Sequence, residues 1–318
     1  MKLFEHPEFD QAMLRAASHF DLSEQFVEKD YYVTEILRII AAELGDRAVF
    51  KGGTSLSKGW GLINRFSEDI DLFVNPATFD PPLGKNAIDR TLKQLSKAVS
   101  EHPALVWLSD EGRTIGGLGR EDHFAYETHF PALPGVRAAV RLEPGVQSGT
   151  FPTEVVPIMS LVAEFLQEQG QADIADDTIG FEMTLLHYRR TFVEKLFALH
   201  GKVIRLLEHD VPLARDARHY PDLYVLSGRH EVRAMLASPE YEEIRRDYDQ
   251  KSREFFPDSY RPPAGLSFSQ SPALFPDPEL RVRLAVDYEA QCRLLFSAGD
   301  YPSFEQVLAR FEEIRELV

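Results

Sequence analysis

Cysteine is almost absent from this chain. Among 318 residues Cys292 is the single cysteine, so an internal disulfide cannot form, as is usual for proteins of the reducing cytoplasm. The chain also lacks an uninterrupted run of about 18 apolar residues, which a membrane-spanning helix needs. Its first residues include acids and a proline rather than the apolar core of a signal peptide. We therefore expect a cytoplasmic protein with no membrane partner.

Basic residues are also scarce, with 35 Lys and Arg against 51 Asp and Glu, which gives a net charge of -16. A uniformly acidic surface would repel nucleic acid. Residues 186–230 differ, because eight basic and five acidic residues give this segment +3 and leave -19 for the remainder. The segment could meet a polyanion or could be a solvated helix surface, and charge alone favours the second interpretation. Its basic residues are Arg189, Arg190, Lys195, Lys202, Arg205, Arg215, Arg218 and Arg229.

The balance of 44% hydrophobic and 27% charged residues is that of a globular protein. Apolar residues recur at helical spacing through most of 9–44, and short apolar runs at 48–50 and 70–74 predict strands. From Thr191 onward helical patterns dominate. We therefore predict a mixed α+β domain over 1–188 and a helical domain over 189–318. Further strands are predicted at 124–130, 136–142 and 181–186.

A glycine turn is the first of two motifs that carry chemistry. Gly52-Gly53-Thr54-Ser55 follows a predicted strand and opens a short helix. Glycine lets the backbone approach a phosphate, and a helix start offers free N–H groups. The two hydroxyls are further donors, and Lys51 and Lys58 are candidate charge partners for a nucleotide. Ser67, shortly before the second motif, is a further candidate for nucleotide contact.

The second motif is an aspartate pair in an apolar strand. Because side chains alternate along a strand, Asp69 and Asp71 project to one side, with their Cα atoms roughly 6–7 Å apart. Such a pair can bind Mg²⁺ or Mn²⁺ together with substrate phosphates. Glu143 ends another apolar strand and is the candidate third carboxylate, helping to deprotonate an attacking hydroxyl. A capped turn and exposed strand acids are the alternative, but the combination favours nucleotidyl transfer from an NTP.

These motifs resemble the AbiEii/AbiGii toxin family, a branch of the polymerase-β-like nucleotidyltransferases. The resemblance extends over the whole chain, although about fifteen residues separate Gly53 from Asp69, longer than the commonest superfamily spacing. It implies an α+β fold, with a polymerase-β-like mixed sheet, flanking helices and a helical C-terminal domain. The other similar segments are Glu28-Lys29-Asp30-Tyr31, Arg190-Thr191-Phe192-Val193-Glu194-Lys195-Leu196 and Arg218-His219-Tyr220-Pro221-Asp222-Leu223-Tyr224.

The resemblance also implies roles for Lys195 and Asp222, with Asp216 as the alternate aspartate. An ammonium near the triphosphate would offset charge on the leaving pyrophosphate. Without the motif, Lys195 would be interpreted as a surface lysine paired with Glu194 or Asp216. Asp222 could position the lysine rather than touch metal, and Pro221, a departure from the family pattern, is expected to loosen the start of its helix.

Two histidines lie in or after these similar segments. We expect His200 and His219 to pack or cap rather than to catalyse. The glycine turn and the aspartate pair form only part of the predicted site. Glu143 would add the third carboxylate and Lys195 a positive charge, so the site is predicted to draw on both halves of the chain.

The resemblance implies a toxin of a toxin–antitoxin or abortive-infection system that transfers NMP to tRNA 3′ ends, with a cognate antitoxin as a possible partner. Two alternatives remain at this point. The acceptor hydroxyl could belong to a protein, which would make the chain an NMP-transferring regulator. Alternatively, the chain could bind nucleotides without catalysis. The retained aspartate pair and Glu143 argue against this last alternative.

Overall fold

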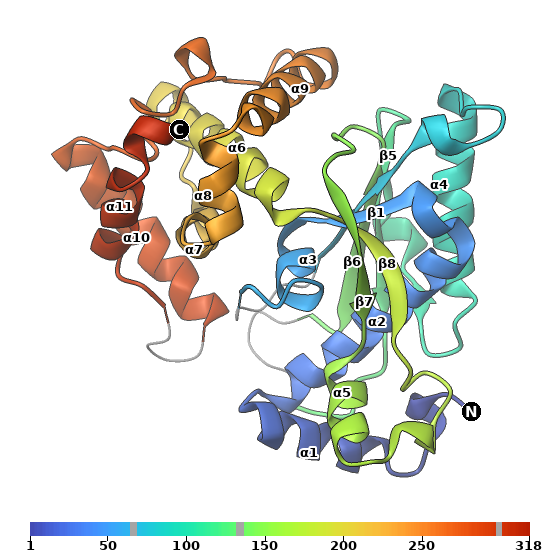
Figure 1. Cartoon of the computed structure of the whole chain (residues 1–318). Coiled ribbons are helices and arrows are strands. Elements are labelled where there is room, and N and C mark those ends of the chain that lie inside the picture. The colour runs from blue at the N-terminus through green and yellow to red at the C-terminus, as the bar shows by residue number, and fades with distance from the viewer. Residues whose placement is uncertain (64–68, 132–136, 297–300) are drawn as a thin grey trace. The chain divides into compact units, whose positions relative to one another are not determined.

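The computed structural model describes residues 1–63, 69–131, 137–296 and 301–318 (Figure 1). The chain divides into two compact units. The first comprises Met1–Trp60 and Ser67–Leu185, and the second comprises Gly61–Phe66 and Leu186–Val318. Within the described ranges, no helix combines the length and the apolar composition needed to cross a membrane.

A mixed sheet forms the centre of the first unit. Its strands follow the order β3-β5-β6-β2-β1-β8-β7, and β4 pairs with β5 outside this path. The two central pairings differ in direction, since β2 is antiparallel to β1 but parallel to β6. The strands are β1 (Ala48–Lys51), β2 (Asp69–Val74), β3 (Val106–Trp107), β4 (Arg113–Ile115), β5 (Gly119–Ala125), β6 (Ala139–Gly145), β7 (Thr153–Ile158) and β8 (Phe181–Leu186).

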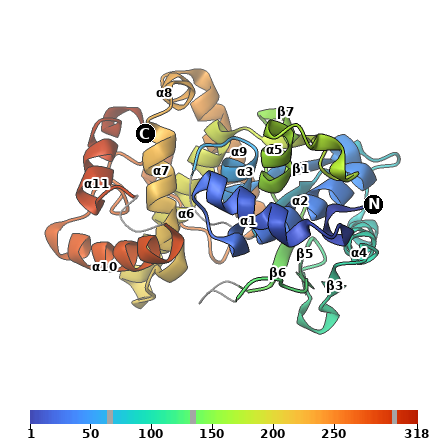
Figure 2. The ribbon, with the colours of Figure 1, turned by 90° about the horizontal axis from the view of Figure 1, so that it is seen from below.

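Helices cover one face of this sheet. Helix α2 contacts β1 and β6, α4 contacts β5, and α1, α2 and α5 lie side by side (Figure 2). Alternation along β2 and β6 turns Ile70, Leu72 and Leu142 into the buried core, so the residues between them face the other side of the sheet. The helices of this unit are α1 (Phe9–Phe20), α2 (Glu24–Leu44), α3 (Gly52–Lys58), α4 (Lys85–Ser100) and α5 (Leu161–Glu168).

Polar side chains on α2 anchor the loops around the sheet. The segment Glu28-Lys29-Asp30-Tyr31 is largely buried in the helix, where unpaired polar groups would be strongly unfavourable. Each of its side chains finds a partner, which explains the segment as a structural signature. Glu28 accepts from the His129 amide at 2.8 Å, Lys29 donates to the Arg137 carbonyl at 2.9 Å, Asp30 accepts from Lys58 at 2.6 Å, and Tyr31 donates to Asp177 at 2.5 Å.

Helices alone form the regular structure of the second unit among its described residues, apart from the end of β8. Helix α6 is capped by the His187 side chain, which accepts from the Arg189 amide. Aromatic side chains fill the core, with Tyr220 stacked edge-on against Tyr288 and Phe304. The helices are α6 (Tyr188–His209), α7 (His219–Ser227), α8 (His230–Leu236), α9 (Pro239–Phe255), α10 (Pro278–Leu295) and α11 (Phe304–Glu312).

Pro221 does not loosen the helix that carries Asp222, so this expectation was wrong. Helix α7 begins at His219, which places Pro221 in its first turn. The first N–H groups of a helix have no partner within the helix, so a proline there removes no hydrogen bond. Both Pro221 and Asp222 are buried in the second unit.

Candidate active site

The three predicted carboxylates lie on neighbouring strands of the first unit. In the parallel pairing of β2 and β6, Asp71 lies opposite Glu143 and Asp69 lies opposite Arg141. These four residues share the face opposite the buried Ile70 and Leu142 layer. Sequence reasoning placed Glu143 on a strand adjacent to the aspartates, and the strand register brings it directly beside Asp71.

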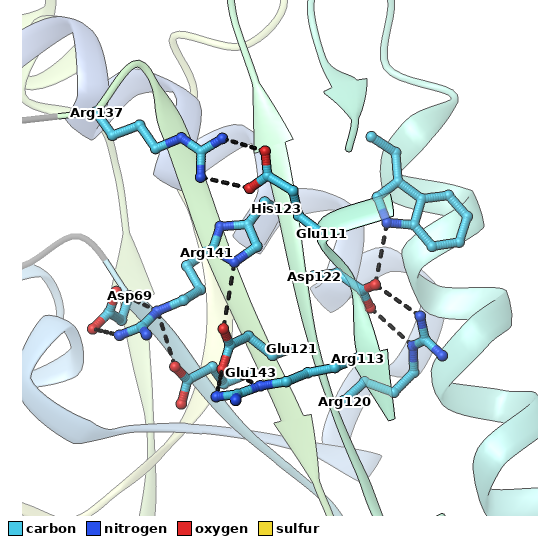
Figure 3. Close-up of polar contacts among 11 residues, drawn as sticks. Asp69, Glu111, Arg113, Arg120, Glu121, Asp122, His123, Arg137, Arg141 and Glu143 are labelled. Carbon is cyan, nitrogen blue, oxygen red and sulfur yellow. Dashed lines mark hydrogen bonds and ion pairs between the residues drawn. The ribbon is translucent and has the colours of Figure 1, made fainter. Parts of the chain in front are cut away.

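Arg141 is the functional candidate that sequence reasoning missed. Its Nε donates to Asp69 Oδ1 at 2.9 Å, its Nη2 contacts Asp69 Oδ2, and Nε also lies 2.9 Å from Glu143 Oε1 (Figure 3). The only sequence signal was its place two residues before Glu143, which puts both side chains on one face of a strand. One guanidinium therefore bridges two of the three carboxylates.

The environment of Glu143 raises the pKa of its carboxyl above the ordinary value of 4.5. Burial raises the pKa of its carboxyl, and the nearby negative charge of Asp71 raises it further, while Arg141 opposes this shift. Asp69 is 6% exposed, and Asp71 has no ion pair among the described residues. A raised pKa suits a group that accepts a proton near neutral pH.

The donor set fits a hard divalent cation. Mg²⁺ prefers oxygen ligands and is usually held by one or two carboxylates plus substrate phosphates, which Asp69 and Asp71 can supply. In the present side-chain conformations, the described residues contain no group of three or more His, Cys, Asp and Glu arranged to hold a metal ion. The guanidinium of Arg141 instead lies between Asp69 and Glu143, 2.9 Å from an oxygen of each.

Gly52 is required by the position of Asp71. Its φ of +79° lies in the left-handed region, and a Cβ added there would lie 2.0 Å from Asp71 Oδ2. Lys51, the preceding residue, is the register partner of Asp71 across β1 and β2. The glycine turn therefore packs directly against one of the two aspartates.

The hydroxyls of the turn hold its conformation. Thr54 Oγ1 donates to the Asp69 carbonyl at 2.5 Å, and Ser55 Oγ donates to the Gly52 carbonyl at 3.0 Å. Both residues are buried. The Thr54 bond ties α3 to β2, the Ser55 bond closes the first turn of α3, and Gly52 and Gly53 remain partly exposed.

Lys58 is held on the side of α2 and α5. Its ammonium donates to Asp30 Oδ1 at 2.6 Å and to the Met159 carbonyl at 3.0 Å, and its side chain is 4% exposed. Asp30 Oδ2 accepts from the Leu161 amide at 2.7 Å, which orders the first turn of α5. The predicted contact of Lys58 with a nucleotide stays a prediction, and Ser67 lies outside the described residues.

In the second unit, Lys195 and Asp222 form a buried ion pair. Lys195 on α6 lies 2.8 Å from Asp222 Oδ2 on α7, with side chains 8% and 1% exposed. His219 Nδ1 lies 3.4 Å from the same ammonium. The interpretation of Lys195 as a surface lysine was wrong, because Glu194 pairs with Arg190 and Asp216 with Lys202.

Acidic partners neutralise much of the basic 186–230 segment. Arg190 is fully buried between Glu194 and Asp247, and Arg189 lies 3.2 Å from Glu240. Among the described residues, Arg205, Arg215 and Arg229 form no ion pair. The unpaired positive charge is thus smaller than the composition suggested.

His200 packs as expected, with its Nδ1 2.7 Å from Ser271 Oγ and its ring edge-on to Phe268. Burial lowers the pKa of its imidazole to about 4. At neutral pH this ring is therefore uncharged and belongs to the core of the second unit.

Comparison with known proteins identifies the class of this enzyme. The family model described as the nucleotidyl transferase AbiEii toxin of type IV toxin–antitoxin systems matches residues 35–310. The chain therefore belongs to this family. It is a nucleotidyltransferase toxin of a type IV system, which implies an NTP substrate and an antitoxin counterpart.

A solved structure confirms the predicted fold class. The chain is similar to MenT4, a nucleotidyltransferase toxin from Mycobacterium tuberculosis H37Rv, with a TM-score of 0.54 and 15% sequence identity over 96% of each chain. The shared architecture is a mixed sheet with flanking helices and a helical C-terminal region. A comparison with curated proteins gave no match.

We expect Gly52→Ala to reduce activity strongly. The new Cβ would displace the Asp71 carboxylate, and displacement of a catalytic group by about 1 Å can lower the rate about a hundredfold. Growth arrest on induced expression and NTP-dependent transfer would measure the loss. Gly45→Ala is the matched control, because Gly45 also has a positive φ, +55°, but has no atom within 4 Å of a new Cβ. Equal activity of the two variants would contradict this role of Gly52.

The buried pair in the second unit can be tested by comparing a single variant with a double variant. Lys195→Met leaves the Asp222 charge buried, so we expect the free energy of unfolding to fall by about 3–5 kcal/mol. Adding Asp222→Asn should restore much of this stability in urea unfolding without restoring growth arrest. If the double variant regained toxicity, Lys195 would serve only to neutralise Asp222.

The raised pKa of Glu143 predicts a pH-dependent stability effect in EDTA. The folded protein favours the protonated carboxyl, so stability is lost as the pH rises through the folded pKa. Glu143→Gln should therefore raise the melting temperature at neutral pH, with no gain below the ordinary value of 4.5.

Glu121→Gln provides a control of opposite sign. Although burial alone would raise it, the pKa of Glu121 is lowered by Arg113, so its ionised form stabilises the fold above 4.5. This variant should lose stability at neutral pH, and the loss should fade as the pH falls through the lowered pKa. Shifts of the same sign in both variants would contradict the assignment.

Proposed function

We propose that the enzyme transfers NMP from an NTP to an acceptor hydroxyl, with the first unit holding the reacting groups. The observation that carries this proposal is the register of β2 and β6, which sets Asp71 opposite Glu143 and Asp69 on the same face. Asp69 and Asp71 would hold Mg²⁺ or Mn²⁺. When bound, such an ion supplies charge neutralisation at the phosphates and lowers the pKa of a bound hydroxyl.

Glu143 is the proposed general base. The acceptor oxygen forms a bond to the α-phosphorus as the bond to the pyrophosphate oxygen breaks, and the hydroxyl proton passes to the Glu143 carboxylate. The raised pKa of this carboxyl supports the role, because a stronger base accepts the proton more readily. The Gly52-Gly53 backbone, beside Asp71, is proposed to contact the phosphates, with Thr54 and Ser55 shaping the turn.

Lys195 is proposed to neutralise charge on the leaving pyrophosphate. Asp222 would position this ammonium, since the two groups lie 2.8 Å apart and both are nearly buried. An aspartate so enclosed is better placed to orient a lysine than to bind a metal ion. The proposal therefore assigns Asp222 a positioning role.

We propose a tRNA 3′ hydroxyl as the acceptor. The support is that three arginines of the second unit, Arg205, Arg215 and Arg229, form no ion pair among the described residues and could contact phosphates. A protein hydroxyl would not need these charges, and a catalytically silent regulator would not need Asp69 or Asp71. Charge reversal and carboxylate removal therefore separate the three functions.

The proposal is tested by incubating the protein with total RNA, Mg²⁺ and each labelled NTP in turn. Label should enter RNA of tRNA size, and Asp71→Asn and Glu143→Gln should abolish it while leaving the fold intact by circular dichroism. Label in protein instead of RNA would favour the protein-modifying alternative. Growth arrest that persists in Asp69→Ala/Asp71→Ala would favour the silent regulator.

Charge reversal tests the tRNA acceptor directly. We expect Arg205→Glu/Arg215→Glu to lower labelling of RNA at least about tenfold, with a weaker dependence on salt, because phosphate contacts release counterions. Arg246→Glu is the control, since Arg246 is exposed on α9 and pairs with Glu242. Unchanged labelling in the double variant would remove Arg205 and Arg215 from RNA recognition.

A further inference from the structure

Arg141 provides a positive charge where the proposed metal ligands meet. Its guanidinium forms a fork onto both oxygens of Asp69 and a third contact at 2.9 Å to Glu143 (Figure 3). Its side chain is 17% exposed, so this contact is only partly screened by solvent. Bidentate contacts between arginine and carboxylate are among the stronger polar contacts in proteins.

Glu121, the neighbouring acidic residue on β5, forms an ion pair with Arg113 rather than with Arg141. Glu121 lies beside Glu143 in the antiparallel pairing of β5 and β6, but Arg113 lies 2.5 Å from Glu121, and His123 lies 3.4 Å from it. Arg141 therefore serves Asp69 and Glu143, while Asp71 has no ion pair among the described residues. Among the described residues, these three carboxylates and one guanidinium carry a net charge of about -2 when all are ionised, which a divalent cation can neutralise.

The fork and a metal ion compete for the same oxygens. Both oxygens of Asp69 accept a hydrogen bond from Arg141, so a cation shared by Asp69 and Asp71 needs an oxygen that the guanidinium already contacts. Two cations side by side on one carboxylate also repel each other. In the metal-free protein, conversely, removal of the guanidinium would leave the carboxylates to repel one another.

We propose that Arg141 is an exchangeable counter-ion of the metal site. It holds Asp69 and Glu143 together without metal and turns away from Asp69 when a divalent cation binds. The freed guanidinium then stays on the face where the polyphosphate of the nucleotide is proposed to bind. This inference rests on the proposed function, because it takes Asp69 and Asp71 as the metal ligands.

Mn²⁺ binding to the full chain, followed by electron paramagnetic resonance without NTP, tests the exchange. Arg141→Gln should bind Mn²⁺ at least about tenfold more tightly than the wild type, because the competing charge is gone. Arg141→Lys keeps the charge but cannot form the fork, so its affinity should fall between the two. Arg137→Gln is the control, because it removes an equal charge that forks onto Glu111, and its affinity should match the wild type.

Thermal unfolding adds a readout that does not depend on activity. In EDTA, Arg141→Gln should melt at a lower temperature than the wild type, and saturating Mg²⁺ should raise its melting temperature more. Equal or weaker Mn²⁺ binding by Arg141→Gln would overturn the inference, since Arg141 would then orient Asp69 rather than compete with metal. If Arg141→Gln does not fold, Arg141→Lys decides between the same outcomes.

Asp71→Asn separates this inference from the proposed function. If it loses both Mn²⁺ binding and transfer while Arg141→Gln gains no affinity, only the exchange role of Arg141 fails. If Asp71→Asn keeps both, the metal role of the aspartates fails and the inference fails with it. Mn²⁺ binding by Arg141→Gln but not by the wild type would support the exchange.

Discussion

The parallel pairing of β2 with β6 is the constraint on which the rest of the site depends. It sets Asp71 against Glu143 and Asp69 against Arg141, and the pleat of both strands turns these side chains away from the core. A slip of one residue would exchange the polar and apolar faces, burying carboxylates among Ile70 and Leu142. The apolar layer beneath the site therefore fixes its polar geometry.

Around this pairing, polar contacts hold the glycine turn in place. Thr54 bonds to the Asp69 carbonyl, Gly52 leaves room for the Asp71 carboxylate, and Lys58 is secured by Asp30 on α2. Thr54, Gly52 and Lys58 were all candidates for nucleotide contact from their place in or near the glycine turn. The side chains of the turn instead form hydrogen bonds that order its backbone, while Gly52 and Gly53 remain partly exposed.

In the second unit, the basic residues of one motif also have different partners. Arg190 is fully buried and joins α6 to α9 through Asp247, whereas Lys195, five residues later, pairs with Asp222 on α7. Composition had suggested a basic surface over this segment, but many of these cations are neutralised within the unit. Among the described residues, Arg205, Arg215 and Arg229 of this segment form no ion pair.

The sequence by itself determined the fold class, the strand that carries Asp69 and Asp71, and the class of chemistry. These depend on short-range patterns, since the alternation of a strand and a glycine turn are local properties. Only the tertiary structure decided which charged side chains pair with one another. Arg141 meets Asp69 across 72 positions of sequence, and Lys58 meets Asp30 across 28. An ion pair across such separations depends on strand register and helix packing, which a single sequence does not encode in any local pattern.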